Sequence, residues 1–369
     1  MLRFLTGLAF ASSLLTLPVP AAEPKAEAFK HALFVWAGDR DKQGNDFLLV
    51  IDADPRSPNF GLDVRNPLQP SVVTSFNEMG GYAHPHSYLR LPNGNVLATF
   101  QHDHATMHSE SRGKSGGLVE ISDKGELVRA VSTADPAFPD ALLMPYSQAV
   151  LPDIDRVVST NSSMHDDDLL SGTTYQVWRL SDLKLLKTAY FDPGEQGDAH
   201  ISPEEPRVGP DGSVFVQSLG CGIERISGID SATPTAKLVH TFPGNWCGKP
   251  IIVGRFLVQS VPAMHGFIVL DLADPAHPVE VSRLKINDDY NPHWTAWDPA
   301  TKRIVITPGS TAGNSDRMYL LKLDAKTGAL SVDEDFRDTD GKAGFSFADR
   351  DWPHGWKGTG LPHGAEFSR

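Results

Sequence analysis

The sequence predicts an all-β protein built as a β-propeller of six recognisable four-stranded blades. Of its 369 residues, 40% are hydrophobic and 21% are charged, which suits a globular protein with a large core. Its 32 glycines and 28 prolines are many for a helical protein and are typical of a turn-rich β protein. A strand-turn-strand pattern also recurs roughly every 40 to 60 residues, and four strands at such a period are typical of a propeller blade.

Five segments share an apolar strand, a tight turn and a second strand that ends in Ser or Thr. They are SYLRLPNGNVLAT from Ser87, SQAVLPDIDRVVST from Ser147, EPRVGPDGSVFVQS from Glu205, KPIIVGRFLVQS from Lys249 and WTAWDPATKRIVIT from Trp294. The turns at 92–94 and 210–212 combine proline, which presets φ, with residues that tolerate a positive φ. We therefore expect each segment to form the inner hairpin of a blade.

A second pair of strands follows each inner hairpin, as in GGLVEISDKGELVRAVS, and a sixth pair, DFLLVIDADPRSPNFG with SVVTSF, precedes the first hairpin. The first blade is incomplete at its inner edge, where only HALFVWAGD is available. We expect the C-terminal LPHGAEFSR to supply its innermost strand, which closes the ring and removes open sheet edges. An all-β sandwich with accidental similarity between its hairpins is the alternative.

One seam in the repeat indicates a deletion. The stretch LDVRNPLQPSVV from Leu62 matches LDLADPAHPVEV from Leu270, yet it directly follows the outer-strand turn DADPRSPNFG. Two outer turns are thus fused, as if one whole repeat had been lost between Gly61 and Leu62. Because a propeller consists of equivalent units, we expect that the ring can still close.

The N-terminal residues 1–22 have the pattern of a secretory signal peptide, with Arg3, an apolar run and small residues near Ala21. We expect them to be removed, leaving residues 23–369 as a single propeller domain without a membrane span, exported to a bacterial periplasm. A retained membrane anchor is the alternative, but it needs a longer apolar stretch.

The net charge limits which classes of partner the protein can bind. The formal net charge is −13 without any run of Lys and Arg, so nucleic acid is a poor candidate partner, and a small-molecule ligand is expected instead. Nothing in the sequence indicates the oligomeric state.

The sequence has two cysteines, Cys221 and Cys247. They are too few for a disulfide scaffold and lack the CxxC spacing of zinc sites. We expect two unpaired buried thiols, with pairing in an oxidising compartment as the alternative.

Polar residues that precede the innermost strands are the candidates for chemistry, because these positions converge at the propeller axis. They are His84, His86, Tyr146, Glu204, Glu205, Cys247, Lys249, His293, His354 and His363. Imidazole suits copper, zinc and iron, so a subset of these histidines is expected to hold one metal ion, with Glu205 as a possible oxygen ligand. The alternative for each histidine is a hydrogen bond to the backbone at a blade entrance.

Two further motifs are weaker. HDHATMH, with His102, His104 and His108, follows the first inner hairpin and is expected to be a solvated loop, with an exposed metal-binding patch as the alternative. HDDD at 165–168 is an acidic loop without the oxygen-ligand spacing of a calcium loop. A GxSxG elbow, a P-loop and a dinucleotide fingerprint are all absent from the sequence.

Taken together, the repeats and histidines resemble the selenium-binding protein family, which includes the methanethiol oxidases. The resemblance spans most of 23–369 and is carried by DFLLVIDADPRSPNFG, AHPHSYLRLPNGNVLATFQ, GGLVEIS, LDLADPAHPVEVSRL and PHGAEFSR. It implies a seven-bladed propeller and, for the oxidase members, copper-dependent conversion of methanethiol and oxygen into formaldehyde, hydrogen sulfide and hydrogen peroxide. It places ligand-type histidines at His86 and His363, whereas His84, His293 and His354 depend on their axial placement.

The sequence departs from this family at two points. The family has a His-His pair that provides copper ligands and would fall between Gly61 and Leu62, but no such pair occurs here. The family's selenium-linked cysteine also has no counterpart. The resemblance therefore implies the fold more directly than the activity.

Three functional hypotheses follow. The first is an exported copper enzyme that oxidises a small thiol, with copper held by His86, His363 and His293 and protons moved by Glu205 or Tyr146. The second is a non-catalytic propeller that binds a metal, a selenium or sulfur ligand or a protein partner. The third is a lyase or hydrolase that uses Glu205 with a histidine, and only the fold favours it.

Overall fold

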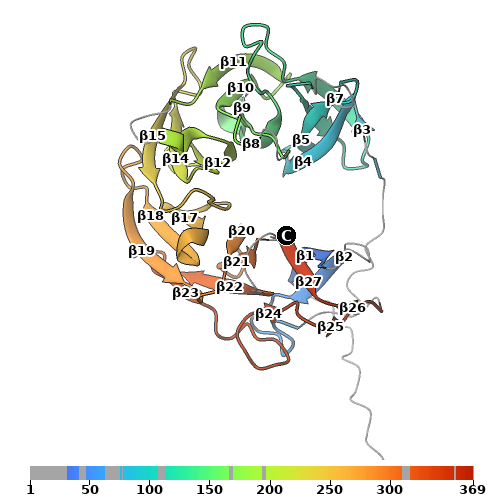
Figure 1. The fold of residues 1–369 in the computed structure, drawn as a ribbon, viewed down its shortest axis with the longest axis vertical. Helices are drawn as coiled ribbons and strands as arrows, with labels where there is room; N and C mark the ends of the chain where they lie inside the picture. Colours follow the sequence, from blue (N-terminus) through green and yellow to red (C-terminus); the bar gives the residue numbers. More distant parts are fainter. Residues whose placement is uncertain are drawn as a thin grey trace, which may run out of the picture.

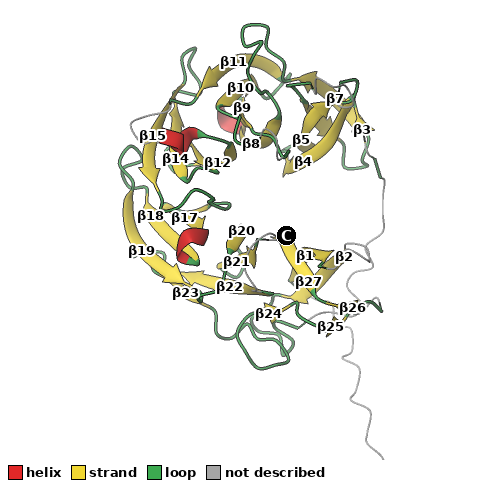
Figure 2. Cartoon of the chain, viewed as in Figure 1, coloured by secondary structure: helices red, strands yellow, loops and turns green. Residues whose placement is uncertain are grey.

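The computed structural model describes residues 31–40, 47–62, 75–76, 78–106, 113–165, 169–192, 197–309, 316–352 and 355–368. Its strands form six blades that follow one another in chain order around a common centre (Figure 1). Three 3-10 turns, η1 (Pro152–Ile154), η2 (Gly197–His200) and η3 (Pro262–Met264), are the helical elements of the described chain (Figure 2). The prediction of an all-β, six-bladed propeller is confirmed.

Three consecutive blades have the predicted four strands. Blade 3 consists of β8 (Pro145–Leu151), β9 (Arg156–Asn161), β10 (Thr174–Arg179) and β11 (Lys184–Tyr190). Blade 4 consists of β12 (Pro203–Val208), β13 (Val214–Ser218), β14 (Gly222–Ser227) and β15 (Thr235–Thr241). Blade 5 consists of β16 (Ile251–Val253), β17 (Phe256–Val261), β18 (Gly266–Asp271) and β19 (Val279–Lys285).

The other blades vary this plan. Blade 2 consists of β3 (Glu78–Met79), β4 (Tyr82–Arg90), β5 (Val96–Asp103), β6 (Gly117–Ile121) and β7 (Leu127–Ser132). Blade 6 consists of β20 (Pro292–Asp298), β21 (Arg303–Pro308), β22 (Arg317–Leu323) and β23 (Leu330–Val332), with β24 (Phe345–Ser346) paired to β22. A short hairpin of β25 (Arg350–Asp351) and β26 (Lys357–Gly358) follows it.

Blade 1 joins the two ends of the described chain. It consists of β1 (Ala32–Asp39), β2 (Phe47–Asp52) and the C-terminal β27 (Gly360–Phe367). Strand β27 pairs antiparallel with β1, with Leu33 opposite Phe367, and the red and blue strands lie side by side in Figure 1. The prediction that LPHGAEFSR supplies the innermost strand of the first blade is confirmed.

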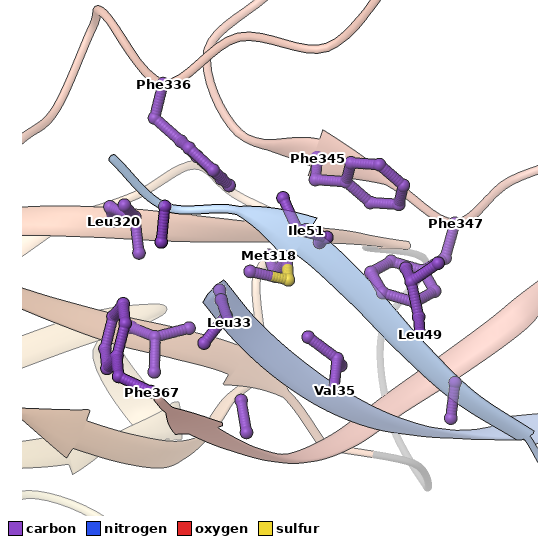
Figure 3. Close-up of a cluster of buried hydrophobic side chains, with 14 of the residues drawn as sticks. Leu33, Val35, Leu49, Ile51, Met318, Leu320, Phe336, Phe345, Phe347 and Phe367 are labelled. Carbon is purple, nitrogen blue, oxygen red and sulfur yellow. The ribbon is translucent and has the colours of Figure 1, made fainter. Parts of the chain in front are cut away.

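Burial explains the strand patterns. All six residues of β17, Phe256–Val261, are buried, because an inner strand is covered by the neighbouring blade on each face. Two of these residues are polar, and one of them, Gln259, donates a hydrogen bond to the carbonyl of Gly248. The outer strand β19 instead alternates between exposed and partly buried residues. Between blades 1 and 6, an apolar cluster holds β27 against β1, β2 and β22; Figure 3 labels its members Leu33, Val35, Leu49, Ile51, Met318, Leu320, Phe336, Phe345, Phe347 and Phe367.

The described strands form an open ring. Innermost strands pack against one another from β4 through β8, β12, β16 and β20 to β27, whereas Figure 1 shows no described strand between β4 and β1. This differs from the expected closed ring. Most of the predicted fused seam, at 63–74, lies outside the described residues, as do the predicted signal peptide at 1–22 and most of SVVTSF.

The prediction of two unpaired thiols is wrong. Cys221 and Cys247 form a disulfide with a Cα–Cα distance of 5.0 Å. Cys221 follows β13 in blade 4, and Cys247 precedes the innermost strand of blade 5, so packing of two neighbouring blades brings them together. Their separation of 26 residues carried no sign of this contact. Separately, none of the helices in the described residues has the length and apolar character needed to cross a membrane.

Candidate functional site

Each blade contributes a polar side chain from the first half of its innermost strand, or just before it, to one network, which we call the axial centre. Its members are His86 on β4, Tyr146 on β8, Glu205 on β12, Lys249 before β16, His293 on β20 and His363 on β27, with Glu204 beside Glu205. These positions are far apart in sequence and come together only because the blades surround one axis (Figure 1).

A buried ion pair lies at the core of the axial centre. The ammonium group of Lys249 contacts the carboxylate of Glu205, and these residues are 3% and 4% exposed. Arg207 Nη1 lies 2.8 Å from Glu205 Oε2, and the Ser147 hydroxyl donates a 3.0 Å hydrogen bond to the same oxygen. Burial raises the pKa of Glu205, but the charges of Lys249 and Arg207 outweigh it and hold this pKa well below the usual range. Glu205 is therefore a fixed anion.

Two aromatic rings complete the surroundings of the lysine. Lys249 Nζ lies 4.9 Å from the ring centroid of Tyr146 and 4.9 Å from that of Trp294, within the range of cation–π attraction. The Tyr146 hydroxyl lies 3.5 Å from Lys249 Nζ. Burial raises the pKa of Tyr146 well above its ordinary value, so its hydroxyl keeps its proton.

Glu204 has the opposite electrostatics to its neighbour. It is buried, it accepts a 3.3 Å hydrogen bond from Gln217 Nε2, and it is hydrogen-bonded to the Tyr146 hydroxyl. Burial raises the pKa of Glu204 to about 7, although the charge of Lys249 opposes this shift. Adjacent residues on a strand point in different directions, and here this separates a permanent anion from a carboxyl group that titrates near neutrality.

The three axial histidines are neutral. His86 Nδ1 donates a 2.8 Å hydrogen bond to the carbonyl of Tyr146, which leaves Nε2 as the ring's acceptor atom. Burial and the charge of Lys249 lower the pKa of His86 to about 4. Burial and the neighbouring His363 lower the pKa of His293 to about 3, and the centroids of these two rings are 4.8 Å apart. His363 is an exposed residue, yet desolvation of its ring and the charge of Lys249 also lower its pKa.

The axial histidines are suitable copper ligands by their chemistry, but their imidazole rings lie too far apart to share one ion in the present arrangement. Neutral imidazoles are copper ligands, and a backbone carbonyl that holds the far nitrogen of a ring, as at His86, is typical of metal-ligating histidines. Among the described residues, however, the group of three ligand atoms within 4.8 Å of one another is His84, His102 and His165. The axial rings would have to move closer to share an ion. His354, the remaining predicted axial ligand, lies outside the described residues.

The structure places His84 elsewhere than the sequence predicts. Its backbone has a φ of 56°, and its ring lies against those of His102 and His165 rather than with His86. The loop interpretation of HDHATMH is wrong at its first residue, because His102 is buried near the end of β5. His104 is exposed and lies 3.2 Å from Glu78, and His108 lies outside the described residues. The signal that pointed to His102 was the apolar run before it, which continues the strand.

Comparisons with known proteins support the fold. No protein-family model and no curated protein matches the chain. Among solved structures, it is similar to a hypothetical selenium-binding protein from Sulfolobus tokodaii, with a TM-score of 0.65, 13% identity, and coverage of 92% of this chain and 93% of that chain. It is also similar to a periplasmic gluconolactonase from Pseudomonas aeruginosa, with a TM-score of 0.52, 13% identity, and coverage of 92% and 99%. At such identity these likenesses show that the chain shares their β-propeller fold.

Proposed function

We propose that the axial centre is the functional site and that it oxidises a small thiol, with copper held by His86, His293 and His363. The observation that supports this best is the convergence of one polar side chain from each of six blades on a buried Lys249–Glu205 pair. The proposal also follows the resemblance to the methanethiol oxidases. When bound, copper would supply the electron transfer between thiol and dioxygen.

The charge at the axial centre favours an anionic ligand. Lys249 and Arg207 bring two positive charges against the single negative charge of Glu205, and the three histidines are neutral. One positive charge is therefore left over whenever Glu204 is protonated. A thiolate would balance it, and thiolate sulfur is a soft ligand that copper accepts.

Glu204 is the better candidate for proton transfer. The sequence suggested Glu205 or Tyr146, but Glu205 is a fixed anion and Tyr146 keeps its proton. A carboxyl group with a pKa of about 7 matches the working range of a general base that accepts the proton of an incoming thiol. Tyr146, hydrogen-bonded to Glu204, would position that carboxyl group.

A non-catalytic binding propeller is the second candidate function. It is favoured by the missing repeat, because the His-His pair that the resemblance would place between Gly61 and Leu62 is absent from the sequence. The spread of the axial histidines points the same way. In this case the axial centre would bind a small sulfur or selenium anion without turning it over.

We also propose export to the bacterial periplasm. Two observations support it: the signal-peptide pattern at residues 1–22 and the Cys221–Cys247 disulfide, since disulfides persist mainly in oxidising compartments.

The test is thiol-dependent release of hydrogen peroxide by the copper-loaded protein. Methanethiol is supplied with dioxygen to the wild type, to His363→Ala and to His277→Ala, whose exposed ring pairs with Asp274. We expect peroxide from the wild type and His277→Ala, and a large loss in His363→Ala. Copper-loaded wild type that binds the thiol but releases no peroxide would favour the binding propeller.

A further inference from the structure

We propose that His84, His102 and His165 form a separate site for one divalent transition-metal ion at the junction of blades 2 and 3. Their ligand atoms all lie within 4.8 Å of one another. His84 lies on β4 and His102 on β5 of blade 2, whereas His165 follows β9 of blade 3. The site shares no residue with the axial centre, and it does not depend on the function proposed for that centre.

The three rings face one another closely. Their centroids are 4.9 Å apart for His84 and His102, 4.8 Å for His102 and His165, and 6.2 Å for His84 and His165. The Nε2 atoms of His102 and His165 are 2.8 Å apart, so one ring donates its N–H to the other. At metal–nitrogen distances of about 2.0 to 2.1 Å, tetrahedral ligands lie about 3.3 Å from one another. The present spacing, 2.8 Å for one pair of ligand atoms and at most 4.8 Å for the set, brackets that value.

The backbone at His84 turns its ring toward this cluster. Among the described non-glycine residues with a positive φ, His84 is the one inside a strand, while the others lie in turns, bends or loops. A positive φ is strained for a residue with a side chain, and such strain is concentrated at functional sites. Ala83 pairs with His102, and the register shifts after Pro85. His84 therefore sits beside His102, while His86, two residues on, belongs to the axial centre.

The loop that carries His165 is fastened to the strand that carries His102. Gln101 Nε2 donates a 2.8 Å hydrogen bond to the carbonyl of Ser162, and the backbone N–H of Met164 donates a 3.2 Å bond to Gln101 Oε1. The N–H of His165 donates to Ser163 Oγ at 3.1 Å. These bonds hold ligand positions from two blades in place, which is what a preorganised metal site requires.

The ligand set indicates the class of metal. Three imidazoles suit Zn²⁺, Cu²⁺ and their neighbours, whereas Ca²⁺ and Mg²⁺ prefer oxygen ligands. A three-histidine set leaves a fourth coordination position open for water or a small ligand. His102 is buried, but His84 is exposed, so an ion can enter from solvent.

The test is titration of Co²⁺, a spectroscopic probe for zinc-type sites, into the metal-stripped full-length protein. Visible absorption bands report tetrahedral nitrogen coordination, and calorimetry gives the affinity. The variants are His84→Ala and His165→Ala, whose side chains are exposed or half-buried, so the fold should survive. His277→Ala is the control. His293→Ala reports whether the ion lies at the axial centre instead.

We expect one Co²⁺ per chain at this site. Each cluster variant should weaken binding by more than about a hundredfold, since even the outer partners of metal ligands contribute about ten- to a hundredfold. His277→Ala and His293→Ala should keep the bands. Absence of tetrahedral bands in the wild type, or their retention in both cluster variants, would overturn the proposal. Loss of the bands in His293→Ala alone would also overturn it.

Discussion

The ammonium group of Lys249 pairs with the carboxylate of Glu205 in the buried centre of the ring, joining blade 5 to blade 4. Lys249→Met would leave Glu205 with Arg207 as its remaining cationic partner. Breaking a buried ion pair typically costs about 3 to 5 kcal/mol, and because Arg207 remains we expect about 3 kcal/mol in urea unfolding. Lys357→Met, which removes a surface pair with Asp351, is the control and should cost less than about 1 kcal/mol.

Equal losses in these two variants would contradict a buried pair. If Lys249→Met does not fold, the double variant Lys249→Met/Glu205→Gln should restore folding, because it removes the uncompensated charge.

The axial histidines should make the fold sensitive to acid. The pKa of His293 falls from 6.5 to about 3 in the folded protein, so between these values the unfolded chain binds a proton that the folded protein refuses. Stability is therefore lost as pH falls from 6.5 toward 3. His293→Gln removes this linkage, and its unfolding free energy should decline less steeply over that range. Parallel curves for the two proteins would show that His293 titrates normally.

Glu204 should make the fold less stable as pH rises, the reverse of the effect of His293. Its pKa rises from 4.5 to about 7 on folding, so between these values the unfolded chain has released a proton that the folded protein retains. The contribution of Glu204 to stability falls as pH rises across this window. Glu204→Gln should therefore gain stability relative to the wild type at pH 8 compared with pH 4. The matched variant Glu205→Gln should lose stability at pH 8, because it removes an ionised partner of Lys249. A gain in both variants would contradict the opposite electrostatics of the two residues.

The disulfide gives a covalent prediction. Wild-type protein unfolded without reductant should contain no thiol that reacts with a thiol reagent. For a separation of 26 residues, the chain-entropy relation gives about 3.5 kcal/mol for the Cys221–Cys247 bond. The double variant Cys221→Ser/Cys247→Ser should lose about that amount in denaturant unfolding. Two reactive thiols in the unreduced wild type would contradict the bond.

Loss of the apolar contacts of β27 should lower the free energy of unfolding. Phe367 on β27 is 4% exposed and packs in the cluster between blades 1 and 6. Phe367→Ala should lower the unfolding free energy by about 3 to 5 kcal/mol. Leu48→Ala, at an exposed position of β2, is the matched control and should have little effect. Similar effects of the two substitutions would argue against β27 as the innermost strand of blade 1.

Much of this fold was predictable because local sequence features determine its hairpins. The turns at 92–94 and 210–212 and the β-branched runs after them determine each inner hairpin, and repetition then predicts the propeller. The axial centre followed from one rule, that strand starts converge on the axis, which brought His86, Lys249 and His293 together.

The remaining features depend on backbone turns and packing that no local pattern encodes. His84 does not lie in the axial centre, because a positive φ turns its side chain toward His102 and His165. These two partners come from a strand end and from another blade. The choice between Glu204 and Glu205 depends on which side of β12 faces Lys249.

Copper binding at the axial centre is tested most directly by elemental analysis of protein that has been loaded with copper and then freed of loosely bound metal. We predict that His86→Ala/His363→Ala holds about one copper per chain fewer than the wild type, because it removes two of three axial ligands. His84→Ala/His165→Ala is the matched variant and should keep the axial copper. Unchanged copper content in His86→Ala/His363→Ala would contradict the claim that the axial centre binds copper.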